Sequence, residues 1–164
     1  HDRNDAQDPR IAELVRAAGL IYLSGGNPTF LANTLRDTLL WKEIESAWRN
    51  GAALAGCSAG AMALADHIPA LRLPTHTATS GLGLLPHIRV LPHFDRMFAR
   101  IPDFMTRFMK VPSGVSVVGI DEDTAIVGGP FEWEVQGRQS AWLFVHGHRK
   151  EFGPGQVLVT PALA

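Results

Sequence analysis

The first sixty residues alternate between amphipathic helical segments and short, fully apolar runs. After Asp8-Pro9, which combines an N-cap aspartate with proline at the first helical position, apolar residues recur at helical spacing. These residues are Ile11, Leu14, Val15 and Ala18. Two further helices are predicted to begin at Pro28 and at the capping Thr38. The runs 20–23 and 52–55 have no polar alternation, which is typical of strands buried on both faces of a parallel sheet.

The second half of the chain has a different pattern of apolar and turn-forming residues. Residues 66–86 are rich in Pro, Thr, Gly and His and are predicted to form a long loop. Strands are expected at 88–91 and 115–120, with a helix at 95–109 between them. Short strands joined by Gly/Pro turns, an antiparallel pattern, are expected at 125–127, 131–135, 141–145 and 157–159. The pattern predicts one α/β domain over residues 1–164, a three-layer sandwich with a mostly parallel sheet and antiparallel C-terminal strands.

Composition narrows the classes of function. The 164 residues are 46% hydrophobic with a formal net charge of −1, so the chain can bury a core and lacks the positive charge that nucleic acid or an anionic membrane attracts. No apolar run approaches the length of a membrane span. Cys57 is the only cysteine, so an intrachain disulfide is excluded and a cytoplasmic protein is expected. We expect no metal or other cofactor. The composition does not decide between a monomer and a homodimer.

The most informative motif is Gly56-Cys57-Ser58-Ala59-Gly60, which reads G-x-S-x-G. It lies between a predicted strand and a run of small helix-forming residues, the context in which a tight turn presents a serine above a sheet. The N–H of Ala59 would then lie at a helix N-terminus, where it can stabilise an oxyanion. The motif favours a serine hydrolase with Ser58 as nucleophile. The pentapeptide alone also occurs in turns that only let a helix pack closely on a sheet.

Three other predicted strands end in residues that could complete such a site: Gly25-Gly26-Asn27, His93 and Asp121-Glu122. Open α/β sheets place their sites at these strand ends. In this interpretation His93 takes the proton of Ser58, Glu122 or Asp121 orients the imidazole, and the N–H groups of Gly26 and Ala59 form the oxyanion hole. Each segment alone also has a purely structural explanation as a tight turn, a capped histidine or a solvated acidic turn.

Two later histidines keep an alternative open. His146 and His148 follow the acidic pair, as the chain order of α/β-hydrolases requires. Their predicted location is a Gly-containing turn near the end of the chain, so we interpret them as surface residues, and no third ligand accompanies them for a metal. Cys57 occupies the x position of the elbow and is expected to pack as a small buried side chain.

Four blocks of the sequence are Tyr22–Asn27, Ala55–Ala61, Leu91–Asp95 and Gly119–Ala125. In order and approximate spacing they together resemble the signature blocks of the dipeptidase E and cyanophycinase serine peptidases. The resemblance implies a fold like that of class I glutamine amidotransferases, with serine in place of their nucleophilic cysteine. It also implies a Ser–His–Glu triad at Ser58, His93 and Glu122, with Gly25 and Gly26 in the oxyanion loop.

The same resemblance implies hydrolysis of dipeptides or other short peptides, with Asp on the N-terminal side of the cleaved bond. Arg96 is the best-placed guanidinium for such an acidic side chain, because a bidentate pair discriminates against neutral analogues; a solvated helix residue is the alternative. Gly25, Asn27 and Asp95 are the other substrate-binding candidates. Two rival functions stay open: a non-peptide amide or ester hydrolase with the same triad, and a non-catalytic amidotransferase-like binding domain.

The chain departs from the family pattern in two places. Pro28 follows Asn27 and has no N–H to offer a substrate. Family members also carry a strand–helix–strand section before the block at Tyr22, and much of it is absent here. We therefore expect the sequence to be an incomplete copy of the domain, completed by a preceding segment of the same protein or by another chain.

Overall fold

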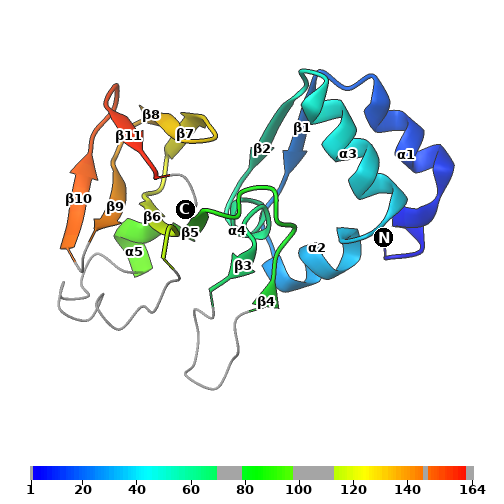
Figure 1. Ribbon diagram of the computed structural model, residues 1–164, viewed down its shortest axis with the longest axis horizontal. Helices are drawn as coiled ribbons and strands as arrows, with labels where there is room; N and C mark the ends of the chain where they lie inside the picture. The colour runs from blue at the N-terminus through cyan, green and yellow to red at the C-terminus, as the bar shows by residue number, and fades with distance from the viewer. Residues whose placement is uncertain (1, 70–78, 98–112, 146–147, 162–164) are drawn as a thin grey trace. The chain divides into compact units, whose positions relative to one another are not determined.

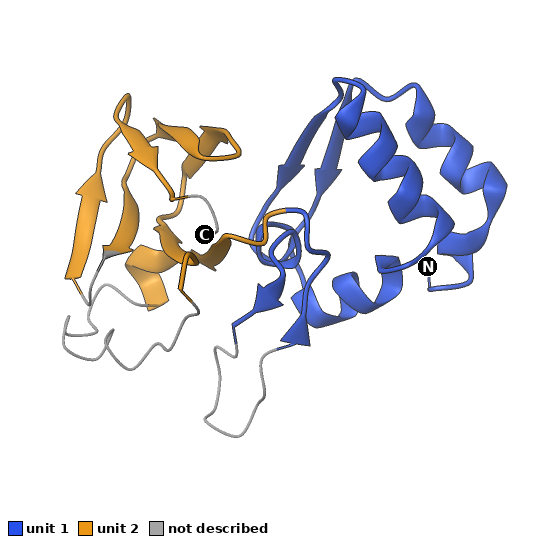
Figure 2. Ribbon diagram, in the orientation of Figure 1, with its two compact units in different colours: residues 1–84 blue, residues 85–164 orange. Residues whose placement is uncertain are grey.

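The computed structural model describes residues 2–69, 79–97, 113–145 and 148–161. The chain divides into two compact units, residues 1–84 and residues 85–164 (Figure 2). Each unit has its own strands, helices and buried side chains. Within the described residues, no helix is long and apolar enough to cross a membrane.

The first unit combines a parallel pair of strands with two helices, α1 and α3, that lie against each other (Figure 1). Its elements in order are a 3-10 turn η1 (Asp5–Gln7), α1 (Pro9–Arg16), β1 (Leu20–Leu23), α2 (Pro28–Leu35), α3 (Leu39–Arg49), β2 (Ala53–Gly56), α4 (Ala59–Ala63), β3 (His67–Ile68) and β4 (Thr79–Ser80). Strands β1 and β2 pair from Leu20 opposite Ala53 to Leu23 opposite Gly56. The two strands therefore end side by side, at the edge where the oxyanion and nucleophile motifs begin.

Local capping chemistry begins the helices of this unit. The Asp8 carboxylate accepts the N–H of Arg10 at the start of α1, and Thr38 Oγ1 accepts the N–H of Trp41 at the start of α3. Both side chains satisfy N–H groups that have no acceptor inside the helix. The expected helix starts at these two positions are confirmed.

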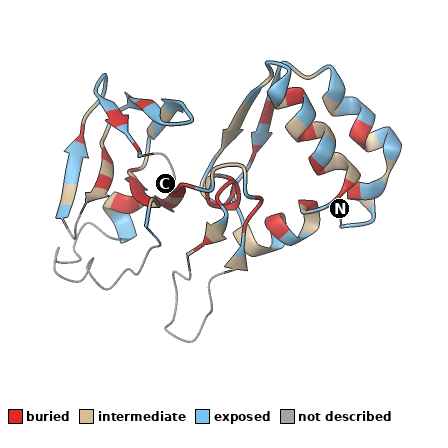
Figure 3. Ribbon diagram, viewed as in Figure 1, coloured by how far each residue is buried: buried red, intermediate tan, exposed pale blue. Residues whose placement is uncertain are grey.

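Burial in this unit differs from the apolar pattern at two places. On α1 the buried residue is Ala12, while Leu14 is 77% exposed, so the expected apolar face is wrong at Leu14. A small side chain at the contact lets two helices approach closely. On β1, Ile21 and Leu23 are buried, while Leu20 and Tyr22 are 62% and 60% exposed. Buried positions occur on each of the helices α1 to α4 (Figure 3), and on α4 they are Ala59, Gly60, Met62 and Ala63.

The second unit consists mainly of strands. Its elements are β5 (Ile88–Pro92), α5 (Phe94–Met97), β6 (Ser116–Ile120), β7 (Thr124–Gly128), β8 (Glu132–Gly137), β9 (Ala141–Val145), β10 (His148–Phe152) and β11 (Val157–Val159). One sheet has the order β10-β9-β6-β5 and another the order β11-β8-β7. Strands β5 and β6 are parallel, and the remaining pairs of these two sheets are antiparallel.

The mixed α/β class expected from the pattern is confirmed. Parallel pairing is found for β1 with β2 and for β5 with β6. The expected helix at 95–109 is described only as α5, and residues 98–112 lie outside the described part of the chain. The expected long loop at 66–86 contains the short antiparallel pair of β3 and β4, with residues 70–78 outside the description. Strand β10 was not expected.

Candidate active site

Ser58 stands on a sharp turn between β2 and α4. Its backbone has φ 51° and ψ −109°, a combination that a residue with a Cβ adopts only under strain. Strand β2 ends at Gly56 and α4 begins at Ala59, so Ser58 is the N-cap residue of α4. Its side chain makes no capping hydrogen bond to the helix. The strand–turn–helix geometry expected from G-x-S-x-G is present. Cys57, however, is exposed, so the expected burial of its side chain is wrong.

The two glycines of the motif are required by close backbone contacts. A Cβ added to Gly56 would lie 2.7 Å from the backbone N of Ala61. A Cβ added to Gly60 would lie 2.0 Å from the carbonyl oxygen of Leu23 at the end of β1. Contacts this short are forbidden for real Cβ atoms, so only glycine lets α4 begin so close to β1 and β2.

The predicted oxyanion loop lies beside the nucleophile. A Cβ added to Gly25 would be in van der Waals contact with Ser58 Cβ, at 3.6 Å, and the N–H of Cys57 donates to Leu23 O at 2.9 Å. Gly26 has φ +132°, a conformation that favours glycine. Ala59, the other predicted donor, is the first residue of α4, where backbone N–H groups have no acceptor inside the helix.

His93 stands at the end of β5, in a left-handed conformation with φ 52°. Its Nδ1 lies 3.2 Å from Oε1 of Glu122, and the two side chains are 42% and 36% exposed. A carboxylate on Nδ1 fixes the imidazole tautomer that leaves Nε2 as the proton acceptor. Of the candidate triad, the second unit thus brings the histidine and one acid together.

The two adjacent acids face different partners. Asp121 Oδ1 accepts the indole N–H of Trp142 at 2.9 Å, and Oδ2 accepts the N–H of Ser140 at 3.2 Å. Asp121 is 8% exposed. Burial raises the pKa of its carboxyl above the ordinary value, an effect opposed by the hydrogen bonds from Ser140 and Trp142. Asp121 is tied to β9, and Glu122 is the acid that contacts His93.

The backbone around Glu122 is held by side chains of two other segments. Its N–H donates to Asp95 Oδ1 at 2.9 Å, and its carbonyl oxygen accepts from Gln139 Nε2 at 3.0 Å and from Thr124 Oγ1 at 3.1 Å. The Arg96 guanidinium lies 3.3 Å from Glu122 Oε2 and 3.7 Å from Asp95 Oδ2. The two residues predicted to bind substrate, Asp95 and Arg96, therefore contact Glu122 in this structure.

Sequence reasoning missed the packing that anchors His93. The next residue, Phe94, is 1% exposed and lies against Trp142 and Phe144 with ring centroids 5.6 Å away in each case. A Cβ added to Gly119 of β6 would lie 2.6 Å from the Phe94 ring. An isolated glycine inside a strand often marks a place where another group packs closely against the backbone. Gly119 was therefore the feature of the sequence that could have indicated the packing of Phe94.

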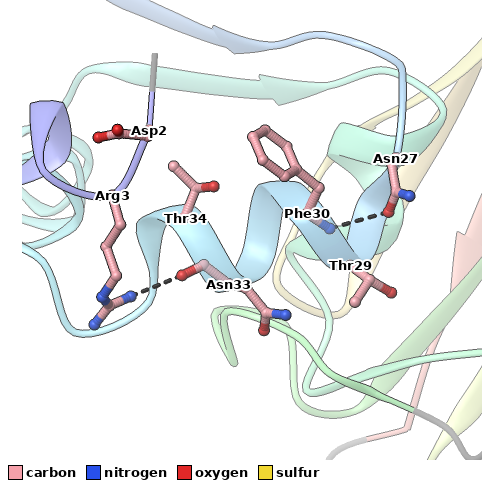
Figure 4. A pocket seen from close by; sticks show the side chains of 7 residues that line it. All are labelled: Asp2, Arg3, Asn27, Thr29, Phe30, Asn33 and Thr34. Atoms are coloured by element: carbon pink, nitrogen blue, oxygen red, sulfur yellow. Dashed lines mark hydrogen bonds between the residues drawn. The ribbon is translucent and has the colours of Figure 1, made fainter.

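Asn27, the remaining substrate-binding candidate, caps α2: its Oδ1 accepts the N–H of Phe30 at 3.0 Å. It also lines a surface pocket of about 440 Å³ in the first unit, shown in Figure 4. The other lining residues are Asp2, Arg3, Thr29, Phe30, Asn33 and Thr34. Among the described residues, no group of three or more His, Cys, Asp or Glu side chains could hold a metal ion. His148 is an exposed residue at the start of β10, and His146 lies outside the described residues.

Comparisons with known proteins converge on one group of peptidases. Residues 2–129 match Peptidase family S51. A cyanophycinase of Synechococcus elongatus is 34% identical over 132 residues, covering 75% of this chain and 40% of its own length. A cyanophycinase of Trichormus variabilis is 29% identical over 154 residues, covering 89% of this chain and 48% of its own length. The chain thus spans less than half the length of these relatives.

Two solved structures are also similar. The crystal structure of a peptidase from an acI-B1 Actinobacterium has a TM-score of 0.83 and 40% sequence identity, covering 96% of this chain and 66% of its own. A peptidase E-like protein of Listeria monocytogenes EGD-e has a TM-score of 0.52 at 19% identity, covering 88% of this chain and 64% of its own, a likeness of fold. The family match covers most of the sequence and includes every block that carried the resemblance, so the chain belongs to peptidase family S51.

Proposed function

We propose that this chain carries the catalytic centre of a serine peptidase that hydrolyses dipeptides or other short peptides. The observation that carries the proposal is the conformation of Ser58, a non-glycine residue held at φ 51° between β2 and the start of α4. A strained serine at such a turn is the structural mark of a nucleophile elbow. Membership of family S51 supports the same chemistry.

The proposed mechanism is acyl transfer through a Ser–His–Glu triad. Ser58 Oγ attacks the scissile carbonyl while His93 Nε2 takes its proton, and Glu122 on Nδ1 stabilises the imidazolium that forms. The N–H groups of Gly26 and Ala59 bind the oxyanion. Collapse of the tetrahedral intermediate passes the proton to the leaving amine and leaves an acyl-enzyme, which a water activated by His93 then hydrolyses. The mechanism requires Ser58 Oγ to come within hydrogen-bond reach of His93 Nε2.

We further propose that the fold is the three-layer sandwich of class I glutamine amidotransferases. We also propose that the protein is located in the cytoplasm. The parallel pairs β1–β2 and β5–β6 and the elbow after β2 support the fold. The single cysteine of the sequence supports a cytoplasmic location, because small secreted domains commonly rely on disulfide bonds.

For the substrate we propose a short peptide that has Asp on the N-terminal side of the cleaved bond. Support for Asp comes from the family resemblance alone, because the Arg96 guanidinium already contacts two carboxylates. A comparison of kcat/KM for Asp-X dipeptides, Ala-X dipeptides and simple esters separates the alternatives. Equal rates for Asp-X and Ala-X remove the acidic preference, and faster ester hydrolysis favours a non-peptide hydrolase.

The nucleophile is tested with a fluorophosphonate probe on the full-length protein. We expect a covalent adduct on Ser58, and Ser58→Ala should abolish it and lower peptide hydrolysis by roughly 10⁴- to 10⁶-fold, as loss of a triad serine does elsewhere. Ser46→Ala is the matched control, because Ser46 is an exposed residue of α3. An adduct on Cys57 with Ser58 unmodified, or full labelling of Ser58→Ala, would contradict the proposal.

A further inference from the structure

We propose that Arg96 and Asp95 are positioning residues that hold the Glu122 carboxylate against His93. The inference rests on the proposed function, because it concerns the orientation of that triad. Glu122 has a separate partner for each oxygen: Oε1 faces His93 Nδ1 at 3.2 Å and Oε2 faces the Arg96 guanidinium at 3.3 Å. A carboxylate held at both oxygens has one orientation, whereas a carboxylate held at one can rotate.

The Glu122 carboxylate needs this second contact because it is not enclosed. The Glu122 side chain is 36% exposed and that of His93 42% exposed, so packing alone does not select one glutamate rotamer. A buried neighbour such as Asp121 is held by hydrogen bonds from Trp142 of β9 and from Ser140, the residue that precedes β9. Glu122 lacks that enclosure, and Arg96 supplies the restraint from outside.

Asp95 fixes the backbone from which Glu122 extends. Its Oδ1 accepts the Glu122 N–H at 2.9 Å, and its Oδ2 lies 3.7 Å from Arg96 Nε. Arg96 therefore stands between two carboxylates whose mutual repulsion would otherwise push Glu122 away. Asp95 orders the main chain of Glu122 and Arg96 orders its side chain.

The same turn of chain carries the base and both positioning residues. Asp95 and Arg96 belong to α5, which follows His93 directly, and the N–H groups of Arg96 and Met97 both donate to His93 O, at 3.1 and 2.9 Å. Parallel pairing sets Pro92 opposite Ile120, so the chain leaves both strands at the same edge. A movement of α5 would shift the base and the Glu122 restraint together.

The position of Arg96 argues against a purely stabilising role. Its side chain is 70% exposed, and exposed ion pairs contribute little to folding stability. Removal of the guanidinium should therefore leave the melting temperature near that of the wild type while it slows the chemistry of Ser58. A substrate contact would instead raise KM for acidic peptides.

The test is a double-mutant cycle of Arg96→Met and Glu122→Gln in the full-length protein, read as the second-order rate of Ser58 labelling by a fluorophosphonate probe. Because the probe has no acidic side chain, the rate reports activation of Ser58 alone. We expect Arg96→Met to lower it roughly 10- to 100-fold, since a misplacement of about 1 Å costs a catalytic group about 100-fold. In the Glu122→Gln background the same substitution should have little further effect.

Matched variants sharpen the test. Arg96→Lys should restore part of the rate, and Asp95→Ala should lower it more than Asp95→Asn, which keeps an acceptor for the Glu122 N–H. Arg138→Met is the control: Arg138 is an 84% exposed arginine beside Asp123, so it makes the same charge change next to Glu122. It should label at the wild-type rate. A downfield Nδ1–H proton resonance, assigned by its loss in His93→Gln, should weaken in Arg96→Met without any substrate.

The possible failures are distinguishable. If the wild type is unlabelled, or Ser58→Ala is labelled equally, the proposed function fails and the inference fails with it. If Ser58 is labelled normally and Arg96→Met has no effect, the inference alone is wrong. If Arg96→Met is labelled at the wild-type rate but has a raised KM only for Asp-X peptides, Arg96 is a substrate contact. Equal losses of the labelling rate in the wild-type and Glu122→Gln backgrounds would show that Arg96 does not act through Glu122.

Discussion

Substitution of Gly60 by alanine tests whether the elbow depends on close contact between α4 and β1. The added Cβ would lie 2.0 Å from Leu23 O, and real Cβ atoms almost never come within 3.0 Å of such an atom, so one backbone must retreat by about 1 Å. Leu23 O also accepts the Cys57 N–H at 2.9 Å. That hydrogen bond would lengthen past its normal range of about 2.7–3.2 Å.

Two effects should follow from this displacement. Overpacking of this kind costs ~1–3 kcal/mol or more in the free energy of unfolding, which lowers the melting temperature by roughly 2–12 °C for a domain of this size. The retreat also moves Gly25 and Gly26, which follow β1 directly, relative to Ser58. A shift of about 1 Å in catalytic groups costs about 100-fold in rate.

The assay combines thermal unfolding with the rate of fluorophosphonate labelling and of peptide hydrolysis. Gly19→Ala is the control, because no atom lies within 4 Å of its added Cβ and its backbone is ordinary; it should match the wild type in both measurements. If Gly60→Ala keeps its melting temperature within 1 °C and its labelling rate within about twofold, the close contact is not required and the account of the elbow is refuted.

Two further predictions concern titrating groups. Because burial raises the pKa of Asp121 above its ordinary 3.8, its contribution to stability is fully present below 3.8 and is lost as the pH rises through the folded-state pKa. In urea unfolding, the free-energy difference between the wild type and Asp121→Asn should fall across that window and be constant above it; a difference independent of pH would contradict the burial effect. The hydrogen bond with the Cys57 side chain holds the pKa of Tyr22 above its ordinary 10.0. Tyr22 is the only tyrosine of the sequence, so Cys57→Ala should lower the midpoint of the phenolate absorbance titration, and an unchanged midpoint would contradict the contact.

Features that depend on local chemistry could be predicted from the sequence. Asp8 and Thr38 cap their helices because a short acceptor side chain reaches the first-turn N–H groups wherever it precedes a helical segment. The turn at Ser58 is local too, because glycine two residues before and two residues after removes every competing Cβ. The two helix caps depend on contacts within a few residues, and the turn at Ser58 depends in addition only on the packing of α4 against β1.

Features that depend on distant partners could not be predicted. A run of apolar residues such as Leu20–Leu23 has no period, so it does not indicate which face is buried. Strand β10 carries His, Arg, Lys and Glu because it is the edge of its sheet, and charges are typical of edge strands. The composition of β10 resembles that of a loop, so the sequence did not indicate that this segment pairs with β9.

The choice between Asp121 and Glu122 shows the same limit at the candidate site. Successive side chains near a strand end point to opposite faces, so one of two adjacent acids must face away from His93. Identity and spacing do not say which. Trp142 and Ser140 of the neighbouring segment engage Asp121, and Asp95 and Arg96 engage Glu122. All four partners lie 19 to 27 positions from their acid in sequence, and two of them, Asp95 and Arg96, are helix residues that were expected to face substrate.

Backbone strain gives a measure of function that is independent of these side chains. Among the described residues, the non-glycine residues with positive φ are Asp37, Ser58, His93 and Asp123. Two of these four are the proposed nucleophile and base, and a third follows Glu122. Such conformations cost about 1–3 kcal/mol each and persist only where the surrounding structure enforces them. The enforcing contacts are present here: Gly56 and Gly60 around Ser58, and the buried Phe94 behind His93. A fold under no functional constraint would relieve this strain with glycine, so its retention at a serine and a histidine argues that those side chains are needed where they stand.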